Sequence, residues 1–156
     1  MAGAVDRFLQ AARSAGLEPD VRRFPEGTKT AEAAARAVGC DIGQIVKSLV
    51  FIADGAPVVA LTSGANRADP KRLASLTGAS GVHRADPEQA RLATGFAIGG
   101  TPPFGYPEPL TILLDRDLLA YEVLWAAAGT PDTVFPITPA DLVRTSGAAV
   151  ADVKEA

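Results

Sequence analysis

Lys47 is the residue of this chain whose surroundings most strongly suggest chemistry. It lies inside an apolar run, residues 45–52, whose β-branched and aromatic side chains predict a buried strand. Side chains alternate between the two faces of a strand, so Lys47 shares its face with Leu49 and Phe51. Because an unpaired ammonium is costly to bury, we expect a carboxylate, a group of carbonyls or a ligand-binding cleft beside it. The alternative is that Lys47 has no functional role: its aliphatic stem packs on the sheet and its ammonium reaches solvent.

A glycine- and proline-rich loop over residues 95–105 is the second candidate. Gly99 and Gly100 permit close backbone approach and unusual dihedral angles, and the prolines that follow stiffen the chain. Amides at Gly99, Gly100 and Thr101 are suited to hold a carbonyl oxygen or a developing oxyanion. The loop lacks the pattern of a Walker loop and of a dinucleotide-binding loop. A rigid surface turn between a helix and a strand is the alternative interpretation.

Other common kinds of catalytic site find little support. One histidine and one cysteine are too few for the usual zinc site, and no carboxylate cluster has a metal-ligand spacing. We expect His83 to be structural or exposed, and no Gly-x-Ser-x-Gly elbow is present. Cys40 has no local histidine partner and is expected to be an inert thiol. We therefore expect neither a metal nor a cofactor.

Length and composition favour an ordinary globular domain. The chain has 156 residues, 47% hydrophobic and 21% charged, so we expect a single domain over residues 1–156. No apolar stretch approaches the roughly 20 residues of a membrane helix, and the first ten residues lack a signal pattern. A lone cysteine fits a reducing compartment, and we expect a cytoplasmic protein without a membrane partner.

Periodicity, capping residues and turn residues predict the elements that must position these candidates. Asp54-Gly55 is a strong hairpin signal between two apolar strands. Helices and strands alternate irregularly, which predicts an α+β fold with a mixed sheet. Helices are expected over residues 5–15, 31–38, 70–76, 87–93 and 139–143. Strands are expected over residues 21–24, 45–53, 57–62, 82–84, 110–114, 122–127, 133–137 and 149–153.

Charge is unevenly distributed along the chain. The net charge of −3 argues against a broad, non-specific nucleic-acid surface. The middle third is nevertheless basic, and Arg67, Lys71 and Arg72 lie close together in sequence. This patch is suited to meet a few phosphates, although a solvated helix of mixed charge has the same composition.

Three stretches together resemble the YbaK/EbsC family of aminoacyl-tRNA deacylases, which is related to the editing domain inserted in bacterial prolyl-tRNA synthetases. They are residues 30–34, 45–51 and 94–105, in the family's order. The strand that carries Lys47 and the Gly-Gly-Thr-Pro-Pro-Phe-Gly segment are the specific parts. The resemblance runs from about Pro25 to the end of the chain.

This resemblance implies a compact α/β domain with a mixed, barrel-like sheet flanked by helices. It also implies hydrolysis of a mischarged amino acid, typically alanine or cysteine, from the 3′ end of proline tRNA. Lys47 corresponds to the family's signature lysine, and the backbone of Gly99 and Gly100 would contact the ester. The family needs no metal, because the terminal ribose hydroxyl of the tRNA is thought to assist the attacking water.

On this model Lys47 fixes the acceptor end, and the Gly99 and Gly100 amides stabilise the oxyanion. The Arg67, Lys71 and Arg72 patch would contact the tRNA body, with prolyl-tRNA synthetase as a further expected partner. Ser48 and the alanines at 126–128 depart from some relatives, which leaves open which small amino acid is removed. The residues expected to bind the substrate are Phe24, Thr28, Ser48, Thr101, Pro102, Pro103, Phe104, Gly105 and Thr133.

Two other functions are compatible with the same residues. The first is a catalytically silent module of this fold that binds tRNA or a synthetase. The second is hydrolysis of a small acyl ester or thioester with no RNA involved. Dependence of turnover on Lys47 separates the hydrolase from the silent module. If turnover did not depend on Arg67, Lys71 and Arg72, hydrolysis of a small ester or thioester would be favoured.

Overall fold

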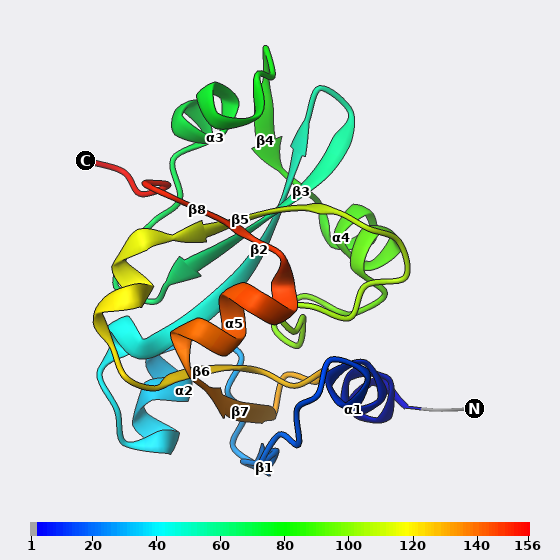
Figure 1. Ribbon diagram of the computed structural model, residues 1–156, viewed down its shortest axis with the longest axis vertical. Coiled ribbons are helices and arrows are strands. Elements are labelled where there is room, and N and C mark those ends of the chain that lie inside the picture. Colours follow the sequence, from blue (N-terminus) through cyan, green and yellow to red (C-terminus); the bar gives the residue numbers. More distant parts are fainter. Residues whose placement is uncertain (1–2) are drawn as a thin grey trace.

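The computed structural model describes residues 3–156, which form an eight-stranded mixed sheet flanked by helices (Figure 1). The helices are α1 (Ala4–Ser14), α2 (Ala31–Val38), α3 (Pro70–Thr77), α4 (Pro87–Thr94) and α5 (Pro139–Ser146), with short 3-10 turns η1 (Ile42–Gln44) and η2 (Arg116–Ala120). The strands are β1 (Arg22–Arg23), β2 (Ile45–Ala53), β3 (Ala56–Ser63), β4 (Val82–Arg84), β5 (Thr111–Asp115), β6 (Leu124–Ala127), β7 (Thr133–Ile137) and β8 (Ala149–Ala151). The expected mixed sheet with flanking helices is confirmed, and each expected element is present, several with the expected bounds and the others with ends that differ by a few residues.

The hairpin of β2 and β3 forms the centre of the sheet. The two strands are antiparallel and pair from Val46 with Ser63 to Ala53 with Ala56. Asp54 and Gly55 both have positive φ, 48° and 85°, as the tight two-residue turn requires. The hairpin predicted from Asp54-Gly55 is therefore confirmed. The strand order is β1-β7-β6-β2-β3-β5-β8, and β4 also pairs with β2.

The second edge of β2 is paired only at its two ends. Parallel pairing with β6 covers Ile45 and Val46, and antiparallel pairing with β4 covers residues 51–53. Beyond these ladders the Ala85 amide donates to the Val50 carbonyl at 3.0 Å. Among the described residues, no strand pairs with this edge from position 47 to position 49. The sheet thus contains a gap beside Lys47.

Alternation along β2 assigns its two faces to different parts of the core. Val46, Val50 and Ile52 pack into the larger cluster, which also holds residues of α1, α4 and α5. On the other face, Phe51 packs in a cluster with α3, and Ile45 packs in a cluster with α2. Lys47 shares this second face and lies between the two smaller clusters. Two separate clusters, instead of one, leave room for a cavity between them.

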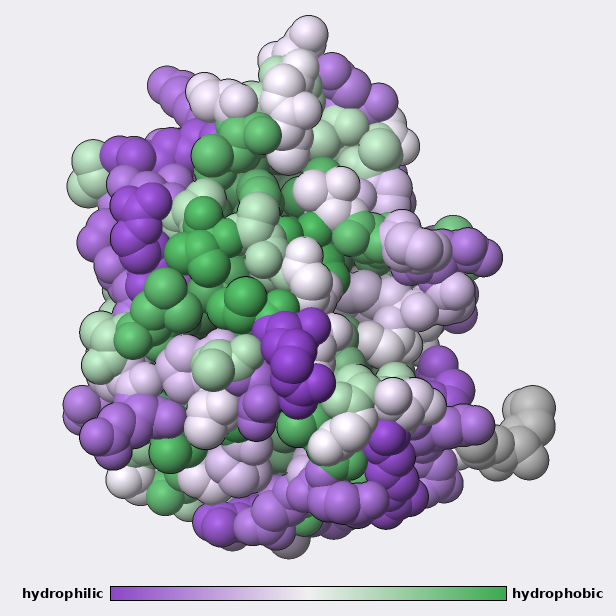
Figure 2. Space-filling model, viewed as in Figure 1, coloured by the Kyte–Doolittle hydropathy of each residue, from purple (hydrophilic) through white to green (hydrophobic). Residues whose placement is uncertain are grey.

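Capping residues set the helix ends that border this region. The Thr30 hydroxyl accepts from the Ala33 amide at 3.1 Å and begins α2, and Gly39 ends it in the left-handed conformation. Asp86 caps α4 in the same way, with Pro87 in the first turn. These ends are as the sequence predicts. No helix within residues 3–156 is long and apolar enough to cross a membrane. Apolar residues gather in the middle of the face shown in Figure 2, with hydrophilic residues around them.

Candidate active site

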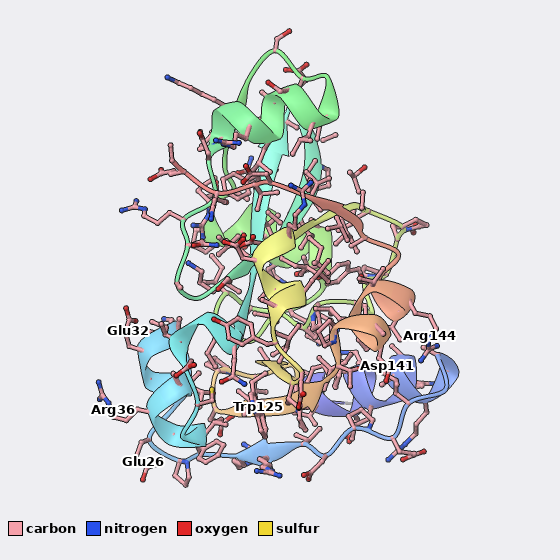
Figure 3. All side chains as sticks on the ribbon, turned by 60° about the vertical axis from the view of Figure 1, so that its left-hand side comes forward. Glu26, Glu32, Arg36, Trp125, Asp141 and Arg144 are labelled. Atoms are coloured by element: carbon pink, nitrogen blue, oxygen red, sulfur yellow. The ribbon has the colours of Figure 1, made fainter. Side chains whose placement is uncertain are left out.

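A cavity of about 390 Å³ opens at the gap beside β2. Six segments form its walls: the stretch into α2, strand β2, Gly64 just after β3, the end of β4 with part of α4, the glycine-rich loop, and the β6–β7 pair. In Figure 3, Trp125 of β6 lies on the inner side of α2, and Glu32 and Arg36 extend from its outer side. The cavity is lined by Thr28, Lys29, Thr30, Ala31, Glu32, Ala34, Ile45, Val46, Lys47, Ser48, Leu49, Val50, Gly64, Arg84, Ala85, Ala90, Ile98, Gly99, Thr101, Trp125, Ala126, Ala127 and Val134.

The Lys47 ammonium is partly buried and points to a backbone carbonyl. Its Nζ donates to the Asn66 carbonyl oxygen at 2.6 Å. Burial is the largest cause that lowers the pKa of Lys47, and the positive charges of Arg84 and Arg67 act in the same direction. Negative charges on Glu32 and Asp115 oppose the shift. A cleft, one of the surroundings expected for this lysine, is thus present, and one backbone carbonyl stands in place of the expected group of carbonyls.

The carbonyl that receives Lys47 is held by a buried carboxylate. Asn66 Nδ2 donates to Asp115 Oδ2 at 2.8 Å and to Asp117 Oδ2 at 2.9 Å. Asp115 is only 1% exposed and also accepts from the Ser63 amide at 3.0 Å. Because Asp115 ends β5 and Ser63 ends β3, two neighbouring strands orient the Asn66 loop. The position of the Lys47 ammonium therefore depends on the sheet, not on a flexible surface turn.

Ser48 presents polar groups to the gap. The Gly64 amide donates to the Ile45 carbonyl at 2.7 Å, so the backbone groups of odd-numbered β2 residues face β3. The backbone N–H and C=O of Ser48 consequently face the gap. Its hydroxyl is buried and makes no hydrogen bond of acceptable geometry within residues 3–156. That hydroxyl lies close enough to Tyr106 to oppose, in part, the rise in the pKa of Tyr106 that burial causes.

The glycine-rich loop contributes Gly99 and Thr101 to the cavity but not Gly100. The Gly100 amide donates to the Ala97 carbonyl at 3.0 Å, so it is committed to the turn. A Cβ at Gly100 would lie 2.7 Å from Thr130 Cα, which shows that glycine is needed there for close backbone packing. The oxyanion role expected of Gly100 therefore does not fit its geometry, and Gly99 and Thr101 remain in position.

Among the other expected substrate-binding residues, only Thr28 and Ser48 line the cavity with Thr101. Phe104 instead packs in the core, 5.4 Å between ring centroids from Phe8. Thr133 is buried in contact with Thr130, and their hydroxyl oxygens are 2.8 Å apart. The residues expected to bind the substrate that lie outside the cavity walls are Phe24, Pro102, Pro103, Phe104, Gly105 and Thr133.

The expected tRNA-binding residues lie away from the cavity walls. Lys71 and Arg72 line a separate groove between α3 and β8, together with Arg116. Arg72 also forms an ion pair with Asp152, with 2.8 Å between a guanidinium nitrogen and a carboxylate oxygen. This pair partly neutralises the charge of Arg72. Arg67 has an 86% exposed side chain, and its charge acts on Lys47. The basic patch is therefore divided between the neighbourhood of Lys47 and a second surface.

Sequence reasoning did not identify several residues of the cavity. The first turn of α2 lies against it, and the capping signal at Thr30 could have indicated that turn. Ala126 and Ala127 enter through the pairing of β6 with β2 and β7. Arg84 enters through the pairing of β4 with β2. No local sequence pattern predicts pairing between strands so far apart in sequence.

The cavity walls carry more positive than negative charge. Lys29, Lys47 and Arg84 face a single acidic residue, Glu32. Within residues 3–156, no group of three or more histidine, cysteine, aspartate or glutamate side chains is arranged to hold a metal ion. The remaining walls are mostly small and apolar. The site is suited to bind a small organic group attached to an anion.

The titration of Lys47 tests this environment directly. We expect its side-chain NMR signal to titrate with a midpoint below 10.5, the ordinary pKa of lysine, because burial and Arg84 both disfavour the charged form. The signal is assigned by its loss in Lys47→Met. A midpoint at or above 10.5 would show that Lys47 is solvated or paired more strongly than this geometry allows.

Comparisons with known proteins identify the class of domain to which this chain is similar. The family model of the aminoacyl-tRNA editing domain matches residues 25–145. The proline–tRNA ligase of Streptococcus sanguinis is 28% identical over 152 residues, which are 97% of this chain and 24% of the ligase. The "Putative Cys-tRNA(Pro)/Cys-tRNA(Cys) deacylase EbsC" of Enterococcus faecalis is 26% identical over 131 residues, 83% of this chain and 80% of that protein.

A solved structure extends the similarity to the whole fold. The crystal structure described as "a putative trans-editing enzyme for prolyl tRNA synthetase" has a TM-score of 0.93 and 44% identity, and the match covers 100% of this chain and 99% of that one. This chain spans about a quarter of the length of the ligase and nearly all of the solved structure. The match over residues 25–145 includes Lys47, the gap in the sheet and the glycine-rich loop. The chain belongs to the aminoacyl-tRNA editing domain family.

Proposed function

We propose that this protein is a free-standing hydrolase that removes a small amino acid, such as alanine or cysteine, from mischarged proline tRNA. The observation that supports this most is the cavity at the gap in the sheet, where a partly buried lysine faces small apolar walls. Membership of the editing domain family supplies the class of substrate, an aminoacyl ester on tRNA.

Lys47 is proposed to fix the acceptor end of the tRNA. An ammonium has three donors, and one of them is used by the Asn66 carbonyl. The others are free to bind a phosphate or ribose oxygen next to the ester. Holding the ester in a fixed orientation contributes several kcal/mol to lowering the barrier in favourable cases, up to about 7–11.

Backbone amides are proposed to stabilise the charge that develops on the ester carbonyl. Gly99 and Thr101 replace Gly100 in this role, because the Gly100 amide is used inside the turn. One such donor contributes about 3 kcal/mol in enzymes that cleave acyl groups. A water molecule adds to the carbonyl carbon, and the ester bond to the ribose breaks. One proton of the water goes to the departing ribose oxygen and the remaining hydroxyl stays on the acyl carbon, which gives free amino acid and uncharged tRNA.

Small side chains are proposed to set the amino-acid preference. Ala34, Ala126 and Ala127 line the cavity beside Trp125, so the wall that would meet the amino acid is made largely of small side chains. Proline is rejected by its shape, whereas the synthetic site of a ligase cannot easily exclude the smaller alanine. The backbone N–H and C=O of Ser48, which face the gap, offer polar contacts to the substrate.

The rest of the tRNA is proposed to lie over the basic residues outside the cavity. Arg67 extends beside Lys47, and Lys71 and Arg72 lie farther along the surface with Arg116. Such contacts to phosphates are weak singly and sensitive to salt. We place the protein in the cytoplasm, as one editing domain that acts on charged tRNA alone or with prolyl-tRNA synthetase.

Deacylation of a set of charged tRNAs tests the proposal. Proline tRNA carrying alanine, cysteine, serine or proline is incubated with the protein, and loss of each ester is followed against spontaneous hydrolysis. We expect rapid loss of one small amino acid while prolyl-tRNA is spared. Cleavage of none of the four esters, with tRNA binding retained, would instead support the silent module.

A further inference from the structure

Arg84 occupies a defined place at the cavity, on the same face of the sheet as Lys47. Its strand, β4, pairs with β2 so that Arg84 lies opposite Phe51. Residues opposite each other in a sheet share a face, and Phe51 shares its face with Lys47. The Arg84 guanidinium carbon lies 5.5 Å from the centroid of the Phe51 ring, a cation–π contact. The ring thus limits the directions in which this exposed side chain can extend.

The charge of Arg84 has no carboxylate partner. No carboxylate within residues 3–156 lies within 4.0 Å of its guanidinium nitrogens. Among the described residues that form the cavity walls, Glu32 alone is acidic, and it must offset Lys29 and Lys47 as well. Arg84 also acts on Lys47 by repulsion, since its charge lowers the pKa of Lys47. An excess of cations over acids at one opening favours an anionic ligand.

The chemistry of a charged tRNA restricts what this anion can be. An esterified amino acid has lost its carboxylate, and its amino group is positive or neutral. The anions at the 3′ end of the substrate are therefore its phosphodiesters. Arginine suits this partner, because its planar guanidinium donates two parallel hydrogen bonds to phosphate oxygens.

We propose that Arg84 binds a phosphodiester of the last nucleotides of the tRNA, on the opposite side of the cavity mouth from α2. This proposal rests on the proposed function for the identity of the ligand. Arg84 then holds the single-stranded end while Lys47 holds the ester, so the two cations have different contacts. Arg84 acts on binding of RNA and not on the reacting bond.

Equilibrium binding of RNA tests the assignment without requiring turnover. The probe is a fluorescent RNA hairpin of an acceptor stem with an uncharged single-stranded 3′ end. We expect Arg84→Ala to weaken binding by about tenfold, the loss typical of one hydrogen-bonded charged contact. The slope of log affinity against log salt should fall by about 0.7, as for one phosphate contact on a single strand. Arg84→Lys should recover the salt slope but only part of the affinity, because lysine cannot make the paired contact.

Arg13→Ala provides the matched control, since it removes the same charge from α1, which contributes no residue to the cavity. It should leave affinity and slope unchanged. If Arg84→Ala and Arg13→Ala lost equal affinity, the loss would be explained by the change in net charge alone, and the proposal would be wrong. Unchanged RNA binding by Arg84→Ala would also overturn it.

Cleavage of two substrates separates this proposal from the proposed function. One is charged tRNA, and the other is the same amino acid esterified to adenosine, which has no phosphodiester. Arg84→Ala should raise the KM for charged tRNA and leave the kinetics on the adenosine ester unchanged. Equal loss on both substrates would contradict phosphate binding. If the wild type cleaved neither substrate, the proposed hydrolase function would be wrong. The RNA-binding measurement would still decide whether Arg84 binds phosphate.

Discussion

Lys47→Ala is expected to lower the single-turnover rate of deacylation by about 100-fold or more on the charged tRNA that the wild type cleaves. Loss of one well-placed charged group at a reacting centre commonly costs 10²–10³ in rate, or about 3–4 kcal/mol. The effect should appear in the rate of ester cleavage within the enzyme–tRNA complex, because Lys47 sets the position of the ester. Quenched-flow measurement with labelled amino acid gives this rate directly.

Stability measurements show whether the lost rate reflects lost chemistry. The lowered pKa of Lys47 means that the folded chain binds this proton less tightly than the unfolded chain. Stability therefore rises with pH between the folded-state and unfolded-state pKa values, and below that window the buried charge costs free energy. Lys47→Met keeps the apolar stem without the charge. Its free energy of unfolding near neutral pH should equal or exceed that of the wild type, although its deacylation is lost.

Lys47→Arg completes the series. Arginine keeps the positive charge, but its larger planar group does not fit the position 2.6 Å from the Asn66 carbonyl. We expect an activity well below that of the wild type and above that of Lys47→Met. If Lys47→Met retained the wild-type rate, Lys47 would be a structural residue and the proposed mechanism would be wrong.

Phe8→Ala is expected to destabilise the protein by about 3–5 kcal/mol, the usual cost of truncating a buried phenylalanine. Phe8 of α1 is 0% exposed and lies 5.4 Å from Phe104 and 4.6 Å from Phe135 between ring centroids. Phe135 belongs to β7, and its neighbour Val134 lines the cavity. Unfolding in urea, followed by circular dichroism, measures the loss.

Leu92→Ala is the matched control for this variant. Leu92 is 68% exposed on α4, so its truncation should change the free energy of unfolding by less than about 0.5 kcal/mol. Residue 8 lies outside the segment 25–145 that the editing domain model matches. A small loss in Phe8→Ala would show that α1 is an appendage, whereas the expected loss makes it part of the core that supports the cavity.

Local patterns in the sequence were sufficient to predict the elements and the importance of Lys47. Apolar runs rich in β-branched residues identified β2 and β3, and Asp54-Gly55 identified the turn between them, because turn geometry depends only on adjacent residues. Capping at Thr30 and Asp86 gave the starts of α2 and α4 for the same reason. An ammonium within an apolar strand indicated a site because burial of charge is costly wherever it occurs.

The composition of the cavity was decided by tertiary structure. The sequence placed Gly100 and Phe104 at the substrate, because a loop of unusual residues suggests contact along its whole length, and it placed Thr133 there as a further expected wall residue. In the fold, Ile98, Gly99 and Thr101 of that loop line the cavity, whereas Phe104 packs into the core.

Arg84, Ala126 and the carbonyl of Asn66 reach Lys47 through pairing of β4 and β6 with β2 and through the Asp115 anchor. Residue types and spacing along one strand determined that Lys47 needs a partner. Which groups meet it depends on the register between strands distant in sequence, which forms only when the whole sheet assembles.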